Sequence, residues 1–249
     1  TFEKNYFVFN KFKKIETIRK WRKSKIKIDQ GDYIESKFRN RGYMNVHTTF
    51  SNKSIKIKIT DSKIKKINNF EKVFNLLSIN SDPFLRNPIA YELYRSYGFL
   101  SPRSSIASFK MNDKFYGLKI IEENYDDNLL RSNGIKIGSM YREAVGANLT
   151  NFRNWDFNNY SMWEKQSLKR ENDYDDWISF LEINSIEDQY AFNILLEKNL
   201  DLDYYLRWLA LTSIFAGSHH TDHNLAFYND FEIQKFRPIP MDTDAFGDH

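Results

Sequence analysis

Four oxygen-bearing side chains flank a predicted β-hairpin near the carboxy-terminal end of the sequence. Asp222 and Asn224 precede an apolar run at residues 225–228, and Asp242 and Asp244 follow a second run at residues 234–239. A hairpin places the residues before its first strand beside those after its second strand. Carboxylate and amide oxygens are the ligands that Mg²⁺ and Mn²⁺ prefer. The spacing therefore predicts a metal–nucleotide site at the open end of this hairpin.

Each of the four residues has a chemical reason to take part. Asp242 and Asp244 are two apart, so on an extended backbone their carboxylates share one face and repel each other unless a cation lies between them. Asn224 adds a neutral oxygen, and Asp222 is placed to accept a proton or to orient a nucleophile. The alternative is an ordinary turn capped by an Asp-Thr-Asp sequence, but the H-x-x-D-x-N cluster before the same hairpin favours the metal site.

The histidines at residues 219–223 permit a second interpretation, a zinc site. His219 and His223 are four residues apart, with His220 and Asp222 between them. The pattern is not H-E-x-x-H, and Gly217 and Ser218 indicate a loop rather than the helix that such a motif requires. Zinc is therefore the less favoured interpretation.

Composition limits the class of protein. The 249 residues are 41% hydrophobic and 16% aromatic, which is enough for a sizeable core and argues against disorder. The absence of cysteine excludes disulfides and thiolate metal sites, and no apolar run is long enough to cross a membrane. Residues 1–69 hold 19 Lys and Arg against 6 Asp and Glu, so this third is either a surface for phosphates or nucleic acid or a solvated lysine-rich face.

The periodicity predicts strands, a helix and a hairpin, followed by a helical region. Strands are expected at 34–41, 54–59, 105–109 and 115–122, and helices at 83–98, 185–198 and 202–216. Gly98 is expected to cap the first helix, and a capping box at Ser185 to begin the second. Residues 1–28 are read as a strand and helix or as a partly ordered basic arm; 125–134 and 170–176 are read as exposed loops.

The ordered motifs resemble those of one protein family. They are R-x-R-G at 39–42, N-K-S-I-K-I-K at 52–58, L-R-N-P-I-A-Y-E-L-Y-R at 85–95, S-P-R-S at 101–104, H-H-T-D-H-N-L-A-F-Y at 219–228 and P-M-D-T-D-A-F-G at 240–247. On these residues the sequence resembles the CotH kinase family, the spore-coat protein H group of atypical protein kinases. The L-R-N…A-Y-E-L-Y-R motif and the P-M-D-T-D-A-F-G motif are the most specific parts.

The resemblance implies an α+β, two-lobed protein-kinase-like fold. It predicts a basic amino-terminal extension at 1–30, a β-rich lobe with one main helix at 31–123, and a mainly helical lobe with the metal-site hairpin at 124–249. It also implies ATP and Mg²⁺ or Mn²⁺ as cofactors and transfer of the γ-phosphoryl group to Ser or Thr of a spore-coat-like protein. Because related proteins continue with further helices, the second lobe is expected to be incomplete at His249.

Carried over to this sequence, the resemblance assigns roles at the hairpin. Asp242 corresponds to the metal-binding aspartate of the family, Asp244 to the second carboxylate of that motif, and Asn224 to the second metal ligand. Asp222 is the candidate catalytic aspartate. The family often carries this aspartate five residues before the asparagine, where this sequence has His219, so the choice between the two positions stays open.

A kinase also needs a strand lysine against the phosphates and a helix glutamate that holds it. Lys56 is the candidate lysine, with Lys53 and Lys58 as open alternatives, and Glu92 on the 83–98 helix is its candidate partner. Arg39, Arg41, Lys53 and Arg86 are the further candidates for contacts with the nucleotide. The sequence has no G-x-G-x-x-G loop, so its phosphate-loop signal is weak.

Two other functions remain as alternatives. The kinase fold also supports nucleotidyl transfer and amino-acid ligation, because fold alone does not determine the reaction. A non-catalytic basic scaffold, with nucleic acid as a less favoured partner, is the third interpretation. The sequence does not decide between a cytoplasmic and a spore-associated or secreted location.

Overall fold

A computed structural model describes residues 20–41, 53–67, 70–79, 85–143, 159–167, 172–214, 224–241 and 243. The chain divides into two compact units, Thr1–Phe84 with Pro102–Asn124 and Leu85–Ser101 with Tyr125–His249. Strands and helices together make an α+β fold, as the sequence predicts.

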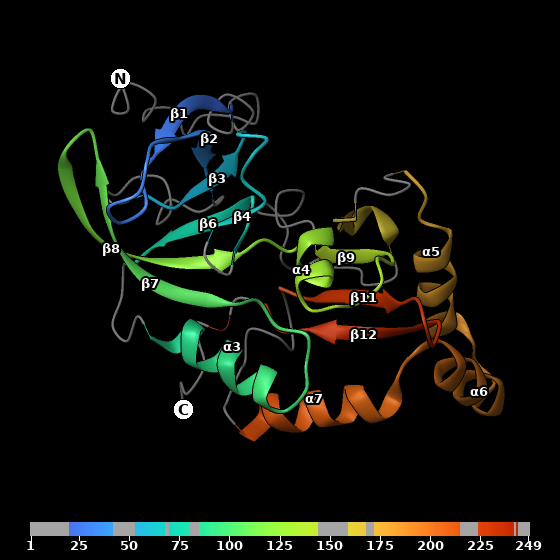
Figure 1. Ribbon diagram of the computed structural model, residues 1–249. Helices are drawn as coiled ribbons and strands as arrows, with labels where there is room; N and C mark the ends of the chain where they lie inside the picture. Colours follow the sequence, from blue (N-terminus) through green and yellow to red (C-terminus); the bar gives the residue numbers. More distant parts are fainter. Residues whose placement is uncertain are drawn as a thin grey trace, which may run out of the picture. The chain divides into compact units, whose positions relative to one another are not determined.

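The first unit contains a six-stranded antiparallel sheet with the strand order β1-β2-β3-β6-β8-β7 (Figure 1). Its strands are β1 (Arg22–Ile26), β2 (Ile34–Asn40), β3 (Ile55–Ile59), β6 (Val73–Ser78), β7 (Ser104–Met111) and β8 (Lys114–Glu123), and a short ladder joins β4 (Lys66–Ile67) to β5 (Phe70–Glu71). The strands predicted at 34–41, 54–59, 105–109 and 115–122 are confirmed. The basic arm forms a strand, β1, where it is described, and its residues 1–19 lie outside the described part of the chain.

Alternation along β3 builds the core of the first unit. Ile55, Ile57 and Ile59 are each no more than 3% exposed and pack with Phe74 and Leu76 of β6. The lysines between them lie on the opposite face, as expected for a strand with a period of two. The sequence reading missed β6, because Phe-Asn-Leu-Leu lacks the alternation of a half-buried strand.

A tight turn connects β7 and β8. Asn112 and Asp113 have φ values of 50° and 62°, the left-handed pair of a type I′ turn. Asn and Asp tolerate this region better than other residues with a β-carbon. Residues 111–114 therefore form a tight hairpin turn, and its backbone twist suits the two long strands that it joins.

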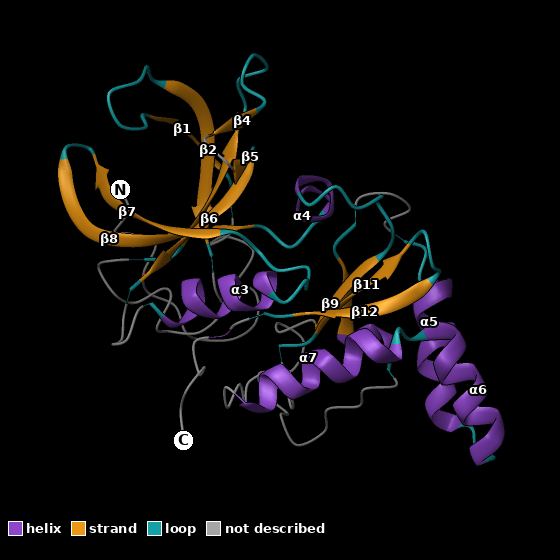
Figure 2. Ribbon diagram, turned by 60° about the horizontal axis from the view of Figure 1, so that its bottom comes forward, coloured by secondary structure: helices purple, strands orange, loops and turns teal. Residues whose placement is uncertain are grey.

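The second unit contains a four-stranded antiparallel sheet and five α-helices among its described residues. The sheet has the order β10-β9-β11-β12, with β9 (Met140–Glu143), β10 (Trp163–Lys165), β11 (Ala226–Asp230) and β12 (Lys235–Ile239). The helices are α3 (Arg86–Ser96), α4 (Asp127–Ser132), α5 (Asp175–Glu182), α6 (Gln189–Asn199) and α7 (Leu202–Ile214). Helices α6 and α7 pack against β12 (Figure 2). The expectation of a mainly helical second lobe omitted β9, which pairs with β11 of the predicted hairpin, and β10, which pairs with β9.

Three local predictions in this unit were wrong. The segment read as an exposed loop at 125–134 forms α4, because Asp126 caps it by accepting a hydrogen bond from Asn128 N–H at 2.9 Å and its two leucines are fully buried. Helix α5 begins inside the second predicted loop. Helix α6 begins at Gln189 rather than Ser185, because Asp188 is its N-cap and accepts a hydrogen bond from Ala191 N–H at 2.7 Å.

The second sheet packs through an aromatic core. Trp177 of α5 is fully buried and stacks on Tyr141 of β9 with ring centroids 4.9 Å apart. Trp163, Phe227 and Phe236 surround it at centroid distances of 4.6 to 5.6 Å. These contacts join α5 to β9, β10 and both hairpin strands. The helix therefore packs against one face of the sheet and stabilises the hairpin.

Helix α3 is part of the second unit. Gly98 ends it with φ of 84°, and Phe99 N–H bonds to Tyr94 O at 3.0 Å, which confirms the predicted glycine cap. The buried Tyr94 hydroxyl bonds to Thr212 of α7 at 2.7 Å. Tyr94 and Phe99 also pack with Tyr204 of α7, so α3 and α7 form one layer.

Candidate functional site

The predicted hairpin is present, and its register determines what lies at its open end. Ala226 pairs with Ile239, and the strands continue to Asp230 opposite Lys235 before a turn at residues 231–234. The residues just before β11 and just after β12 therefore emerge at the same end of the sheet. Asn224 is described there, whereas the predicted residues Asp222, Asp242 and Asp244, and the alternative His219, lie outside the described residues.

A buried carboxylate lies beside Asn224. The Asn224 backbone N–H donates a hydrogen bond to Glu143 Oε2, and Glu143 N–H donates to Leu225 O at 2.9 Å. Glu143, the last residue of β9, is 6% exposed, and Asn224 has a left-handed φ of 58°. The sequence analysis missed Glu143, because nothing in its poorly patterned surroundings predicts that β9 pairs with β11.

Two hydrogen-bonded contacts connect α3 to the segment that follows β12. The Thr243 hydroxyl bonds to Asn87 Oδ1 at 2.8 Å, and Thr243 is 1% exposed. The Tyr125 hydroxyl makes the second contact by bridging the two segments. It donates a hydrogen bond to Pro240 O at 2.9 Å and lies 2.9 Å from the hydroxyl of Tyr91 on α3. Thr243 is the residue between Asp242 and Asp244, so these bonds bring the L-R-N-P and P-M-D-T-D motifs together.

The same helix carries Arg86 and Glu92. Arg86 begins α3 next to Asn87, which places it at the helix end that contacts the D-T-D segment. Glu92 is two turns further on, has a side chain that is 70% exposed, and forms an ion pair with Arg95. The proposed pairing of Glu92 with Lys56 stays a prediction.

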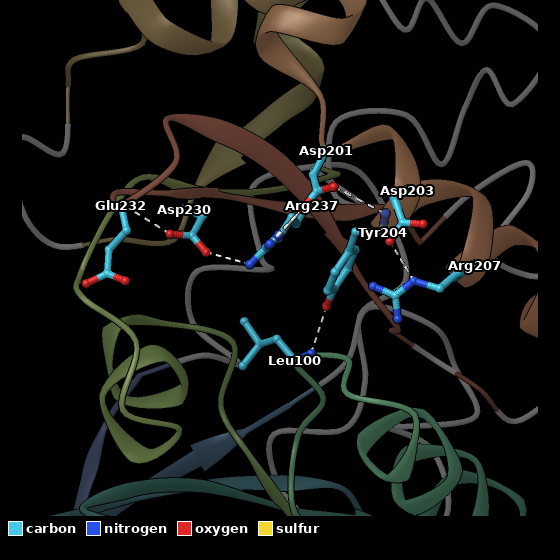
Figure 3. Close-up of polar contacts among 8 residues, drawn as sticks. All are labelled: Leu100, Asp201, Asp203, Tyr204, Arg207, Asp230, Glu232 and Arg237. Atoms are coloured by element: carbon cyan, nitrogen blue, oxygen red, sulfur yellow. Dashed lines mark hydrogen bonds and ion pairs between the residues drawn. The ribbon is translucent and has the colours of Figure 1, made fainter.

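An arginine on β12 connects the hairpin to the start of α7 (Figure 3). Arg237 Nε donates to Asp201 Oδ2 at 2.7 Å, and its Nη1 donates to Asp230 Oδ2 at 2.6 Å. Its guanidinium also lies over the Tyr204 ring, 4.9 Å from the centroid. Burial lowers the pKa of Arg237, but hydrogen bonds to Tyr228 and Asp201 outweigh it and raise the pKa overall, so the guanidinium is charged throughout the usual pH range.

In the first unit, polar residues form a row across one face of the sheet. Arg39 of β2 pairs with Lys56 of β3, Lys56 pairs with Asn75 of β6, and Asn75 pairs with Glu122 of β8. Directly paired residues lie on the same face of a sheet. Two of the predicted phosphate-binding residues, Arg39 and Lys56, are thus neighbours, and the tertiary structure adds Asn75 and Glu122, which are each 1% exposed. We call these four residues the polar row.

The other two candidates in this unit, Arg41 and Lys53, lie just outside the strands that carry Arg39 and Lys56. Arg41 follows β2 and forms an ion pair with Glu122 at 3.3 Å, with a side chain that is 29% exposed. Lys53 precedes β3 and is buried, and its carbonyl oxygen accepts a hydrogen bond from the Lys119 ammonium. Lys58, the open alternative to Lys56, is exposed.

Lys119 predicts a pH dependence of stability. Burial lowers its pKa from 10.5 to about 8, so between these values the unfolded chain binds the proton more tightly and stability rises with pH. We expect Lys119→Met to raise the free energy of unfolding by about 1–2 kcal/mol at pH 7. This advantage should shrink as the pH rises from 8 to 10.5, which urea unfolding at four pH values would measure. The same change at exposed Lys110 is the control, and an advantage that is constant with pH would contradict the assignment.

Comparison with known proteins agrees with these motifs. The model of the CotH kinase protein family matches residues 38–248, so the chain belongs to that family, and membership suggests a kinase-like protein. Inner spore coat protein H of Bacillus subtilis (strain 168) is 29% identical over 170 residues, which is 66% of this chain and 47% of that protein. The chain thus aligns with about half the length of this relative. In the described part of the chain, no helix has the length and apolar character needed to cross a membrane.

Proposed function

We propose that this protein is an ATP-dependent phosphotransferase that uses Mg²⁺ or Mn²⁺ and transfers the γ-phosphoryl group to Ser or Thr of a protein acceptor. The observation that supports this most is the bond between Asn87 and Thr243, which are 156 residues apart in the sequence. It joins the two most specific motifs of the family at the open end of the hairpin. Membership in a family described as kinases supports the same conclusion.

The chemistry of the side chains fits a divalent cation. Asp242 and Asp244 flank a buried, hydrogen-bonded threonine in the sequence, and Asn224 lies two residues before β11. Asp242, Asp244 and Asn224 would hold Mg²⁺ through oxygen atoms. The buried Glu143 carboxylate accepts a hydrogen bond from the Asn224 backbone N–H. When bound, the cation would neutralise charge on the phosphate oxygens.

The other residues position the reactants. Asp222 accepts the proton of the acceptor hydroxyl, which makes that oxygen the nucleophile that attacks the γ-phosphorus. Lys56 binds phosphate oxygens as the strand lysine, with Glu92 as its partner. Arg39, Arg41, Lys53 and Arg86 supply further cationic contacts. Catalysis would then come mainly from orienting the reactants and from preorganised positive charge around the phosphates.

The acceptor class follows from the relative. Because the Bacillus subtilis protein is named as an inner spore coat protein, we propose a coat protein as the acceptor and the developing spore as the location.

Labelled ATP tests the proposed reaction. We would incubate the full chain with Mg²⁺ or Mn²⁺, ATP labelled at either the γ- or the α-phosphate, and casein or candidate coat proteins. Label from the γ-position in Ser or Thr is the expected result. Label from the α-position would instead establish nucleotidyl transfer or ligation. No label, together with no ATP-induced rise in melting temperature, would leave a non-catalytic scaffold.

A further inference from the structure

Glu122 is a buried carboxylate on the polar row. It is 1% exposed, and Arg41 Nη2 donates a hydrogen bond to its Oε1 at 3.3 Å. Two strands of the sheet, β3 and β6, lie between β2, which Arg41 follows, and β8, which carries Glu122. A buried carboxylate that bonds to Arg41 and shares a row with Arg39 and Lys56 needs an explanation, because its charge repels phosphate.

The geometry of Arg41 suggests that explanation. A guanidinium has five N–H donors in a rigid plane. Within the described residues, the Arg41 side chain makes one polar contact, the bond from Nη2 to Glu122. The side chain is 29% exposed, so a ligand can reach the other donors. An arginine bonded to a carboxylate through one nitrogen presents the rest of its plane in a defined direction.

A second observation indicates that this face binds a ligand. Asn75 Nδ2 donates to Glu123 O at 3.4 Å, which determines which way the amide points. Its Oδ1 is buried and has no hydrogen-bond partner among the described residues, although Asn75 is only 1% exposed. Buried polar atoms are nearly always paired in folded proteins. A donor group of a bound molecule, such as a hydroxyl or an amine, would pair this oxygen.

We propose that Glu122 is a positioning residue for nucleotide binding, which holds Arg41 so that the remaining donors of its guanidinium bind phosphate oxygens. The proposal rests on the proposed function, since it takes a nucleoside triphosphate as the ligand. The proposed role gives the Glu122 carboxylate an effect on nucleotide affinity opposite to the one expected from its charge alone. A carboxylate that merely lies near the phosphates weakens binding, whereas one that orients Arg41 strengthens it.

This difference in sign provides the test. We would titrate the full chain and its Glu122→Gln variant calorimetrically with ATP and Mg²⁺, and separately with adenosine, which lacks phosphates. We expect Glu122→Gln to weaken ATP binding about tenfold and to leave adenosine binding unchanged. Unchanged or tighter ATP binding by the variant would overturn the proposal.

Glu123→Gln is a matched control on the same strand. Glu123 is 2% exposed and is held by Arg103, through the Arg103 backbone N–H at 2.8 Å and an ion pair at 3.7 Å. As the next residue along β8, it points to the opposite face of the sheet. The proposal expects this variant to bind ATP as the wild-type protein does. If both variants weaken ATP binding equally, the loss comes from removing any buried charge from this unit. That result would also overturn the role assigned to Glu122.

A second variant covers a failure of Glu122→Gln to fold. Arg41→Lys keeps the positive charge on a partly exposed side chain but lacks the planar set of donors, so we expect about tenfold weaker ATP binding here as well. Wild-type affinity in Arg41→Lys would contradict the proposal. If the wild-type protein itself binds no ATP, the proposed function fails. If the wild-type protein binds ATP and Glu122→Gln binds it equally well, only the role of Glu122 fails.

Discussion

Replacing Asp242 with Asn is expected to reduce γ-phosphoryl transfer by roughly 10²- to 10³-fold with little change in melting temperature. The substitution keeps the size of the side chain and removes the negative charge that the proposed metal site needs. The neighbouring Thr243 is buried and bonded to Asn87, so the backbone of the motif has support that does not depend on the Asp242 carboxylate. The expected loss is therefore chemical rather than a loss of folding.

The measurement is the initial rate of label transfer from γ-labelled ATP over a series of Mg²⁺ concentrations. Asp203→Asn is the control, because Asp203 has a side chain that is 81% exposed and pairs only at the surface of α7 with Arg207. We expect the control to keep full activity. Wild-type rates for Asp242→Asn at all Mg²⁺ concentrations would remove Asp242 from the proposed site.

Arg237→Met is expected to lower the free energy of unfolding by about 2–3 kcal/mol. The change leaves two carboxylates without their shared partner, and the side chains of Asp201 and Asp230 are only 18% and 12% exposed. It also removes one of the two cations that lie over the Tyr204 ring, the one 4.9 Å from its centroid. Arg237 connects β11 and β12 to the residue before α7 (Figure 3). We therefore expect its replacement to destabilise the packing of the hairpin against α7.

Urea unfolding and the melting temperature measure this effect, with an expected decrease of roughly 5–10 °C. Arg207→Met is a closely matched control, since it makes the same chemical change in an ion pair whose side chains are 52% and 81% exposed, and we expect less than about 0.5 kcal/mol there. Adding Asp201→Asn and Asp230→Asn to Arg237→Met should recover part of the loss, because the uncompensated charges are then removed. Equal losses in Arg237→Met and Arg207→Met would contradict a buried network.

The strands and turns with strong local signals were predictable from sequence. Alternation indicated the strand at 54–59, and the two neighbouring strands at 105–109 and 115–122 indicated the β7–β8 hairpin, because both depend on neighbours close in the chain. Strand β6 and helix α4 were not predictable in this way. Strand β6 is buried without alternating, and the leucines of α4 lie in a short polar segment whose burial depends on the core around Met140 and Tyr228.

The sequence by itself determined the family, the hairpin near the carboxy-terminal end and the residue types available for a metal–nucleotide site. Tertiary structure decided which distant residues accompany them. Glu143 beside Asn224 and Glu122 beside Arg41 are each separated by 81 residues, and Asn87 beside Thr243 by 156. Such neighbours are set by strand pairing and helix packing, which follow from the burial of the whole unit. A local sequence pattern carries no information about these neighbours. A glutamate in a segment without clear periodicity cannot be assigned to a site until the strand that pairs with it is known.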